Sequence, residues 1–125
     1  MAKVLANALI AFGVALHSYT LLYGLKNSSS GNYGFSMALW LLSISPYAIA
    51  GSFVWFFRKP YAAVGALVLP SIMDAGTFYS VLINPRGSTA ALALLFAPLW
   101  NLFLFLLIGA LIGWWYERRA GQDAL

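Results

Sequence analysis

The chain has 125 residues, of which 62% are hydrophobic and only 8% are charged, and its net charge is +4. Soluble domains carry about 25% charged residues, and a small soluble protein has too large a surface to be wetted by so few of them. The composition therefore excludes an ordinary soluble domain and indicates a chain whose main solvent is the lipid bilayer. The absence of cysteine excludes disulfide bonds and thiolate metal sites.

Four hydrophobic segments are each long enough to span about 30 Å of hydrocarbon at a rise of about 1.5 Å per residue. They predict helices at about residues 4–24, 35–57, 61–83 and 90–116, followed by a polar, frayed tail at 117–125. The first segment is longer than the core of a cleaved signal peptide, so we expect it to be retained. The connections are short, which places consecutive helices side by side and antiparallel. The predicted fold is all-α, a single transmembrane domain over residues 1–125 that forms an up-down bundle of four helices.

The connections have compositions typical of loops and turns. A polar, flexible loop joins the first two helices. Residues 58–60 predict a tight turn, with Pro60 at the first position of the third helix, where a missing N–H has no consequence. The Asn-Pro-Arg-Gly sequence at 84–87 is a strong turn signal, and Ser88 or Thr89 could cap the fourth helix.

Positive charge is distributed unevenly between the two ends of the predicted bundle. One end carries five cations: Lys3, Arg58, Lys59, Arg118 and Arg119. The other end carries Lys26 and Arg86. Cytoplasmic loops are enriched in Lys and Arg, so we expect both termini in the cytoplasm and a multi-pass protein of the bacterial cytoplasmic (inner) membrane. Because these cations set topology, nucleic acid is not an expected partner.

Each predicted helix carries a polar side chain at a similar depth, slightly outside the bilayer centre. In chain order these residues are His17, Ser43, Asp74 and Asn101. An ionised carboxyl group at this depth costs at least about 2.5–3.5 kcal/mol, so Asp74 must be protonated or have a partner. His17 is the only base at that depth, and imidazole titrates near neutral pH. The sequence therefore predicts an Asp74–His17 pair that carries or senses a proton.

Helical periodicity extends this polar layer to neighbouring positions. The full candidate site is His17, Asp74, Asn101, Ser43, Tyr47, Thr20 and Thr77. Gly13 shares the face of His17 and would let helices approach closely. The Asp74–His17 contact could instead only fasten two helices, because intramembrane hydrogen bonds average about 0.6 kcal/mol. Both interpretations remain open at the level of sequence.

Prolines and glycines within the spans predict local deformations and close packing. Pro46, Pro70 and Pro98 are expected to kink their helices. The carbonyl groups that they free could face a cation or water, although ordinary kinking is the favoured interpretation. Gly109 and Gly113 form a small-xxx-small motif, which could dimerise the protein but more simply packs the fourth helix within its own bundle.

Missing motifs narrow the chemistry. The sequence has one histidine, no HExxH motif and no glycine-rich nucleotide loop, so we expect no metal site and no cofactor. We do not expect an enzyme, although a lipid or quinone enzyme with His17 as its base is a remaining alternative.

Two functional hypotheses follow. The first is a small proton- or ion-linked transporter or channel subunit that uses the polar layer. Since four helices enclose little space, this hypothesis favours two or more copies. The alternative is a non-transporting accessory, assembly or immunity-type membrane protein that binds a partner. Expected partners are membrane lipids and either a second copy or another membrane protein.

Overall fold

The computed structural model describes residues 1–27, 33–84 and 90–122, which are almost entirely helical. The elements in chain order are α1 (Ala2–Asn27), α2 (Tyr33–Trp55), α3 (Pro60–Phe78), the π-helix η1 (Tyr79–Ile83), α4 (Ala90–Trp100), the π-helix η2 (Asn101–Phe105) and α5 (Leu106–Gln122). In the described part of the chain, four continuous helical stretches are long and apolar enough to cross a membrane. They are Ala2–Asn27, Tyr33–Trp55, Pro60–Ile83 and Leu92–Gly121. The predicted transmembrane four-helix bundle is confirmed.

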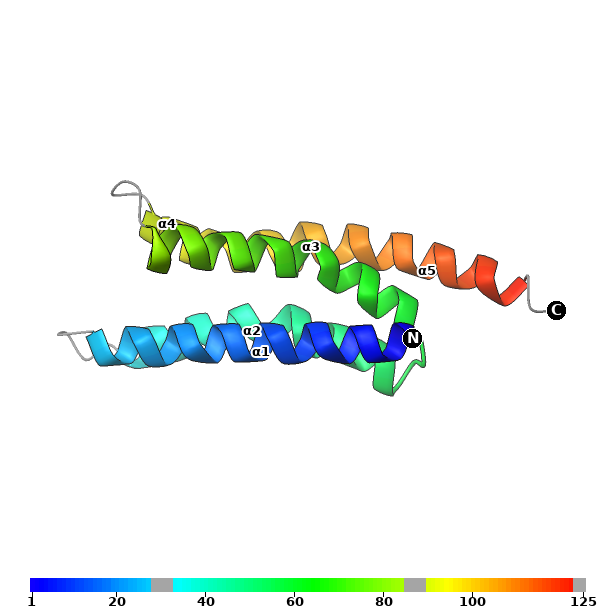
Figure 1. The fold of residues 1–125 in the computed structure, drawn as a ribbon, viewed down its shortest axis with the longest axis horizontal. Coiled ribbons are helices and arrows are strands. Elements are labelled where there is room, and N and C mark those ends of the chain that lie inside the picture. Colours follow the sequence, from blue (N-terminus) through cyan, green and yellow to red (C-terminus); the bar gives the residue numbers. More distant parts are fainter. Residues whose placement is uncertain (28–32, 85–89, 123–125) are drawn as a thin grey trace.

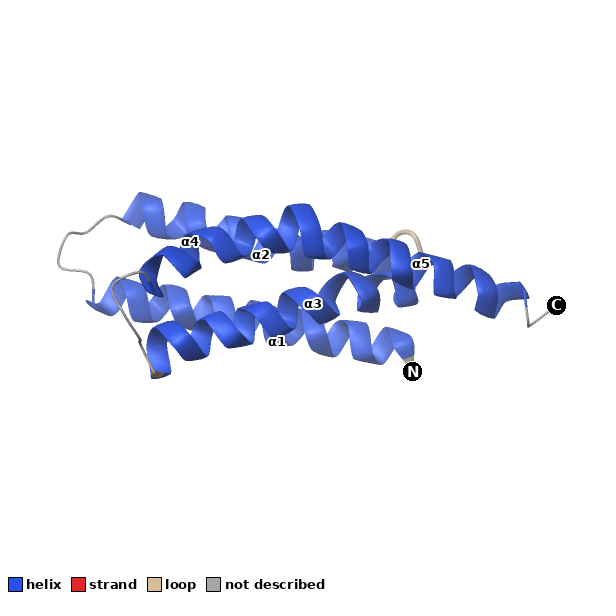
Figure 2. Ribbon diagram, turned by 90° about the horizontal axis from the view of Figure 1, so that it is seen from above, coloured by secondary structure: helices blue, strands red, loops and turns tan. Residues whose placement is uncertain are grey.

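The four spans form a two-by-two bundle. Figure 1 shows α1 paired with α2, and α3 paired with α4 and α5, with both chain termini at the same end. Figure 2, turned by 90°, shows α1 beside α3 and α2 beside the α4–α5 span. Helix α1 therefore contacts both α2 and α3, and α3 packs most extensively against α5. In this arrangement a residue near mid-depth of any span can face the other three.

The turn between α2 and α3 lies where the sequence predicts it. Helix α2 ends at Trp55, and α3 begins at Pro60, which occupies the first helical turn. The backbone reverses direction through Arg58, which has a left-handed conformation with φ of 54°. The N–H of Lys59 then donates to the carbonyl oxygen of Phe53 at 2.7 Å. The predicted turn at 84–87 and the predicted caps Ser88 and Thr89 lie outside the described residues, apart from Asn84.

The predicted frayed tail is wrong as far as Gln122, because α5 continues to that residue. Two side-chain contacts explain the longer helix. The guanidinium groups of Arg118 and Arg119 stack over the rings of Trp114 and Trp115, which lie one turn earlier. The Cζ atoms are 3.8 and 3.9 Å from the respective ring centroids. Such cation–π pairs at i and i+4 stabilise the last turns of a helix.

Small residues make up much of the packed core. The buried apolar cluster consists of Ala6, Tyr47, Ala50, Val54, Ala63, Ala66, Leu67 and Leu106. These residues lie at mid-depth or in the half of the bundle that contains the termini. Many large apolar side chains are exposed on the outer surface, as expected where lipid is the solvent.

Glycines bring α3 and α5 into backbone contact. A methyl group added at Gly109 would overlap the carbonyl oxygen of Gly65, and one added at Gly113 would overlap the carbonyl oxygen of Tyr61. The small-xxx-small motif thus lies inside the bundle and faces α3. Close approach of this kind maximises van der Waals contact where no hydrophobic driving force exists between helices.

The three internal prolines lie in helices that continue past them. Pro46 is within α2, Pro70 within α3 and Pro98 within α4. Helix α3 changes direction along its length in Figure 1, which is the deformation expected of an internal proline. Shortly after Pro98 the fourth span widens into the π-helix η2, which begins at Asn101. π-Helical turns occur frequently at functional sites.

Candidate functional site

The carboxyl group of Asp74 is the point where all four spans meet. The hydroxyl of Tyr47 on α2 donates to Oδ2 at 2.6 Å, and Nδ2 of Asn101 on η2 donates to Oδ1 at 2.6 Å. Nε2 of His17 on α1 lies 2.9 Å from Oδ2. Asp74 itself, on α3, is only 4% exposed. The structure thus brings together four of the residues that the sequence predicts.

The geometry suits a carboxyl group that can exist in either protonation state. Its two oxygens accept hydrogen bonds from Tyr47 and Asn101, and the imidazole of His17 is the third hydrogen-bonding partner. An ionised carboxylate accepts a hydrogen bond from the N–H of Nε2, whereas a protonated carboxyl group can donate one to Nε2 when that nitrogen carries no proton. Hydrogen bonds of this kind are stronger in a medium of low dielectric, where an unpaired charge would be costly. The interaction therefore offsets the cost of placing Asp74 in the bilayer.

Gly13 positions the hydroxyl of Tyr47. The Tyr47 side chain is fully buried, and its ring lies against the Cα of Gly13, so that a methyl group added there would overlap the ring. The same ring makes an edge-on contact with His17 at a centroid distance of 5.7 Å. Because no other residue type leaves this space, Gly13 fixes where the phenol enters the layer.

Replacing Gly13 by alanine should displace the Tyr47 ring and break its hydrogen bond to Asp74. We expect a loss of about 1–3 kcal/mol in the free energy of unfolding, the usual cost of overpacking, measured by denaturation with sodium dodecyl sulfate in mixed micelles. The loss should be smaller when the same change is made in a Tyr47→Phe background, since the hydrogen bond is already absent there. Equal losses in both backgrounds would contradict this positioning role.

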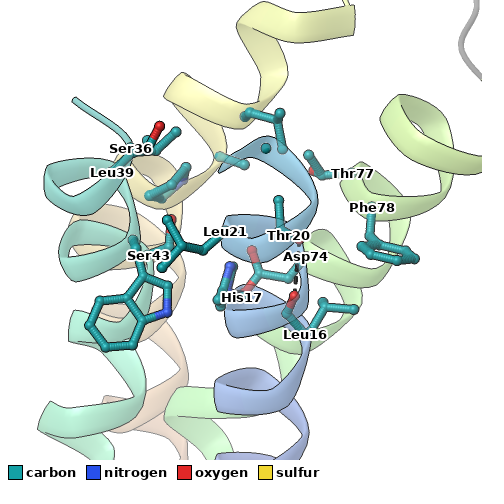
Figure 3. A pocket seen from close by; sticks show the side chains of 15 residues that line it. Leu16, His17, Thr20, Leu21, Ser36, Leu39, Ser43, Asp74, Thr77 and Phe78 are labelled. Atoms are coloured by element: carbon teal, nitrogen blue, oxygen red, sulfur yellow. Dashed lines mark hydrogen bonds and ion pairs between the residues drawn. The ribbon is translucent and has the colours of Figure 1, made fainter. Parts of the chain in front are cut away.

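A cavity of about 220 Å³ opens on one side of the Asp74–His17 pair. Its polar lining consists of His17, Thr20, Ser36, Ser43, Asp74 and Thr77. Figure 3 shows these side chains gathered between α1, α2 and α3, with Asp74 and His17 next to each other. The lining continues along α1 as far as Gly24, about two turns or 10 Å beyond His17. The cavity therefore leads from the pair towards the end of the bundle that is opposite the termini.

The remaining predicted polar residues line this cavity and do not touch the carboxyl group. The Thr20 hydroxyl donates to the carbonyl oxygen of Leu16 at 2.9 Å, one turn back on its own helix. Ser43 is buried at the cavity wall, and Thr77 lies one turn beyond Asp74 on α3. These hydroxyls make the wall polar along the path to His17.

Ser71 is a buried polar residue that the sequence reasoning missed. It lies three positions before Asp74, so helical periodicity could have placed it on the same face. Its Oγ and the Oδ1 of Asn101 are the two buried side-chain polar atoms that lack a hydrogen-bond partner among the described residues. Within the same described ranges, no three His, Cys, Asp or Glu side chains are grouped so as to hold a metal ion.

Fold and site together define a small multi-pass membrane protein with a hydrogen-bonded carboxyl group in its interior. Comparisons of the chain with protein-family models, with curated proteins and with solved structures gave no match. Its function must therefore be inferred from the chemistry of the site.

Proposed function

We propose that this protein is a proton-linked transporter or channel subunit in which Asp74 binds the transported proton and His17 delivers it. The observation that carries the proposal is the position of the pair: Asp74 is buried among hydrogen-bonding partners, and His17, the more exposed of the two, lines the cavity beside it. Intramembrane ionisable residues mark proton and ion pathways. A purely structural contact between two helices would not require a cavity that ends at the ionisable pair.

His17 has the geometry of a relay. Its Nε2 contacts Asp74, its side chain is 13% exposed, and it lines the cavity. Nδ1 makes no hydrogen bond to another described residue. A proton from the cavity would bind Nδ1 while the proton on Nε2 passes to Oδ2 of Asp74. The imidazole would then be neutral with its proton on Nδ1, and the carboxyl group would be neutral too.

The hydrogen bonds around Asp74 remain satisfied after this transfer. The new carboxyl proton donates back to Nε2 of His17, which has become an acceptor. Tyr47 and Asn101 continue to donate to the carboxyl oxygens, because each of the two oxygens still has a lone pair that can accept a hydrogen bond. Because the carboxyl group takes part in the same three hydrogen bonds in both protonation states, cycling between the two states breaks none of them.

The bundle also supports one-sided access to the site. On the terminal side of Asp74, the buried residues Ala63, Ala66 and Leu67 of α3 belong to the packed apolar core. This core separates the carboxyl group from the end that carries the termini. Proton release towards that end would need a rearrangement of the helices or a second copy that completes the pathway.

Flux measurements on reconstituted protein test the proposal. Vesicles that contain the protein and a trapped pH-sensitive dye should acidify faster than empty vesicles when a potassium diffusion potential drives proton entry. His17→Gln, which keeps a polar side chain but cannot relay a proton, should slow acidification about a hundredfold or more, the scale of a lost acid–base group.

The matched control is Tyr19→Leu, two residues away on the exposed face of α1. It should leave the acidification rate unchanged. A wild-type rate equal to that of empty vesicles would overturn the proposal, as would full flux in His17→Gln. Either result would favour the view that the pair only fastens helices together.

A further inference from the structure

A second cavity lies at the end of the bundle that carries the termini. It has a volume of about 480 Å³ and is lined by Lys3 of α1, Val54 and Trp55 of α2, Arg58 of the turn, and Pro60 of α3. Two cationic side chains from separate elements therefore converge on one space. The remaining wall is apolar or aromatic, so the cavity combines positive charge with hydrocarbon contact.

The positive charge of this cavity has no counter-charge in the part of the chain that the structure describes. None of its lining residues is acidic, and the side-chain ion pair found among the described residues is that of His17 with Asp74, in the bundle interior. Glu117, near the same end, approaches the backbone N–H of Ala62 at 3.4 Å instead. Two uncompensated cations around one cavity favour an anionic ligand.

Backbone conformation gives an independent reason to regard Arg58 as selected for its side chain. It is the only non-glycine residue with positive φ in the described ranges. Glycine adopts this conformation without steric cost and is the usual residue where a helix ends in this way. Non-glycine residues in such conformations cluster at functional sites.

The depth of the cavity favours a lipid headgroup as the source of the anion. It lies where α2 ends and α3 begins, at the boundary between the apolar spans and water. Trp55, Phe56 and Phe57 beside it are 59%, 80% and 64% exposed, and exposed aromatic rings are typical of the headgroup level. Lipid phosphates occupy this depth, and basic pockets between transmembrane helices bind anionic headgroups.

We propose that Lys3 and Arg58 bind the phosphate group of an anionic phospholipid, whose glycerol and upper acyl carbons contact Trp55 and Pro60. The cavity discriminates by charge, because the choline group of a zwitterionic lipid would add a cation next to two others. This lipid site is separate from the proton pathway and does not depend on it.

Lipid titration of the purified protein in a neutral detergent tests the proposal. Phosphatidylglycerol should bind at least about fivefold more tightly than phosphatidylcholine, measured by native mass spectrometry. Arg58→Gly should weaken phosphatidylglycerol binding about fivefold, the effect of losing one cation near the membrane surface. The variant should fold at least as stably as the wild type, because glycine relieves the positive φ. Lys3→Gln should weaken binding similarly without altering the turn.

Arg118→Gln is the matched control, because Arg118 lies at the same end but stacks on Trp114 of its own helix. It should leave phosphatidylglycerol binding unchanged. Equal binding of the two lipids, or equal weakening by Arg118→Gln and Arg58→Gly, would overturn the proposal in favour of unspecific attraction. Displacement of the lipid by millimolar inorganic phosphate would also overturn it, since the site would then serve a soluble anion.

Discussion

Replacement of Asp74 by asparagine is expected to abolish proton movement while the four spans remain assembled. The amide has nearly the shape of the carboxyl group, and its oxygen can still accept from Tyr47 at the position of Oδ2. It cannot bind and release a proton in the accessible pH range, so the relay from His17 has no acceptor. Acidification of reconstituted vesicles should fall to the rate of empty vesicles. The free energy of unfolding should fall by about 1–2 kcal/mol, as expected for weakening a few intramembrane hydrogen bonds.

Two further substitutions separate the chemical role of Asp74 from its structural role. Asp74→Glu keeps an ionisable group and should retain part of the flux. Asp74→Leu would leave three buried donors facing an apolar side chain, with a cost of about 1–3 kcal/mol for each unsatisfied group, and should prevent assembly. Wild-type flux in Asp74→Asn would show that the polar layer only fastens the helices.

The sequence predicts the four-helix bundle and the centre of the site for the same physical reason. In a chain where hydrocarbon is the solvent, an apolar run long enough to span the bilayer has few alternatives to a helix. Against that background each polar residue is conspicuous, and counting along the span gives its depth. His17, Asp74 and Asn101 share a depth, and the structure places them in contact.

Other features of the site depend on side-chain volumes and helix rotation, which the sequence does not specify by simple counting. Nothing in the apolar pattern shows that the cavity leads towards the end opposite the termini, because this depends on how side chains from different helices pack together. The π-helix that begins at Asn101 is likewise not marked by the apolar pattern. Residues Ser43 and Thr77 share the depth or face of the layer, yet they line the cavity and do not touch the carboxyl group.

The continuation of α5 to Gln122 shows a different limit of the same reasoning. Polar composition at the end of the chain predicts a solvated, frayed tail, but the charged residues there lie one turn after tryptophans. Arg118 and Arg119 cover Trp114 and Trp115 with their guanidinium groups. Each arginine follows its tryptophan by four residues, so the spacing in the sequence predicts these pairs, whereas the composition of the segment does not.

Gly109→Ala is expected to destabilise the bundle by about 1–3 kcal/mol, the usual cost of overpacking a well-packed interface. The added methyl group would overlap the carbonyl oxygen of Gly65, which belongs to the backbone of α3 and cannot move without shifting the helix. Unfolding by sodium dodecyl sulfate in mixed micelles, followed by tryptophan fluorescence, measures the change. Since the motif faces α3 of the same chain, the loss should be independent of protein concentration.

Gly76→Ala makes the same chemical change in a helix where the added methyl group meets no atom within 4 Å. Only the helix propensity then differs, and alanine should stabilise this position by about 0.5–1 kcal/mol. The two substitutions are therefore expected to change the free energy of unfolding in opposite directions. This difference separates the effect of backbone contact from any general effect of adding a methyl group. If Gly109→Ala were as stable as Gly76→Ala, α3 and α5 could not be in backbone contact. A loss that grew on dilution would instead assign Gly109 and Gly113 to an interface between two copies.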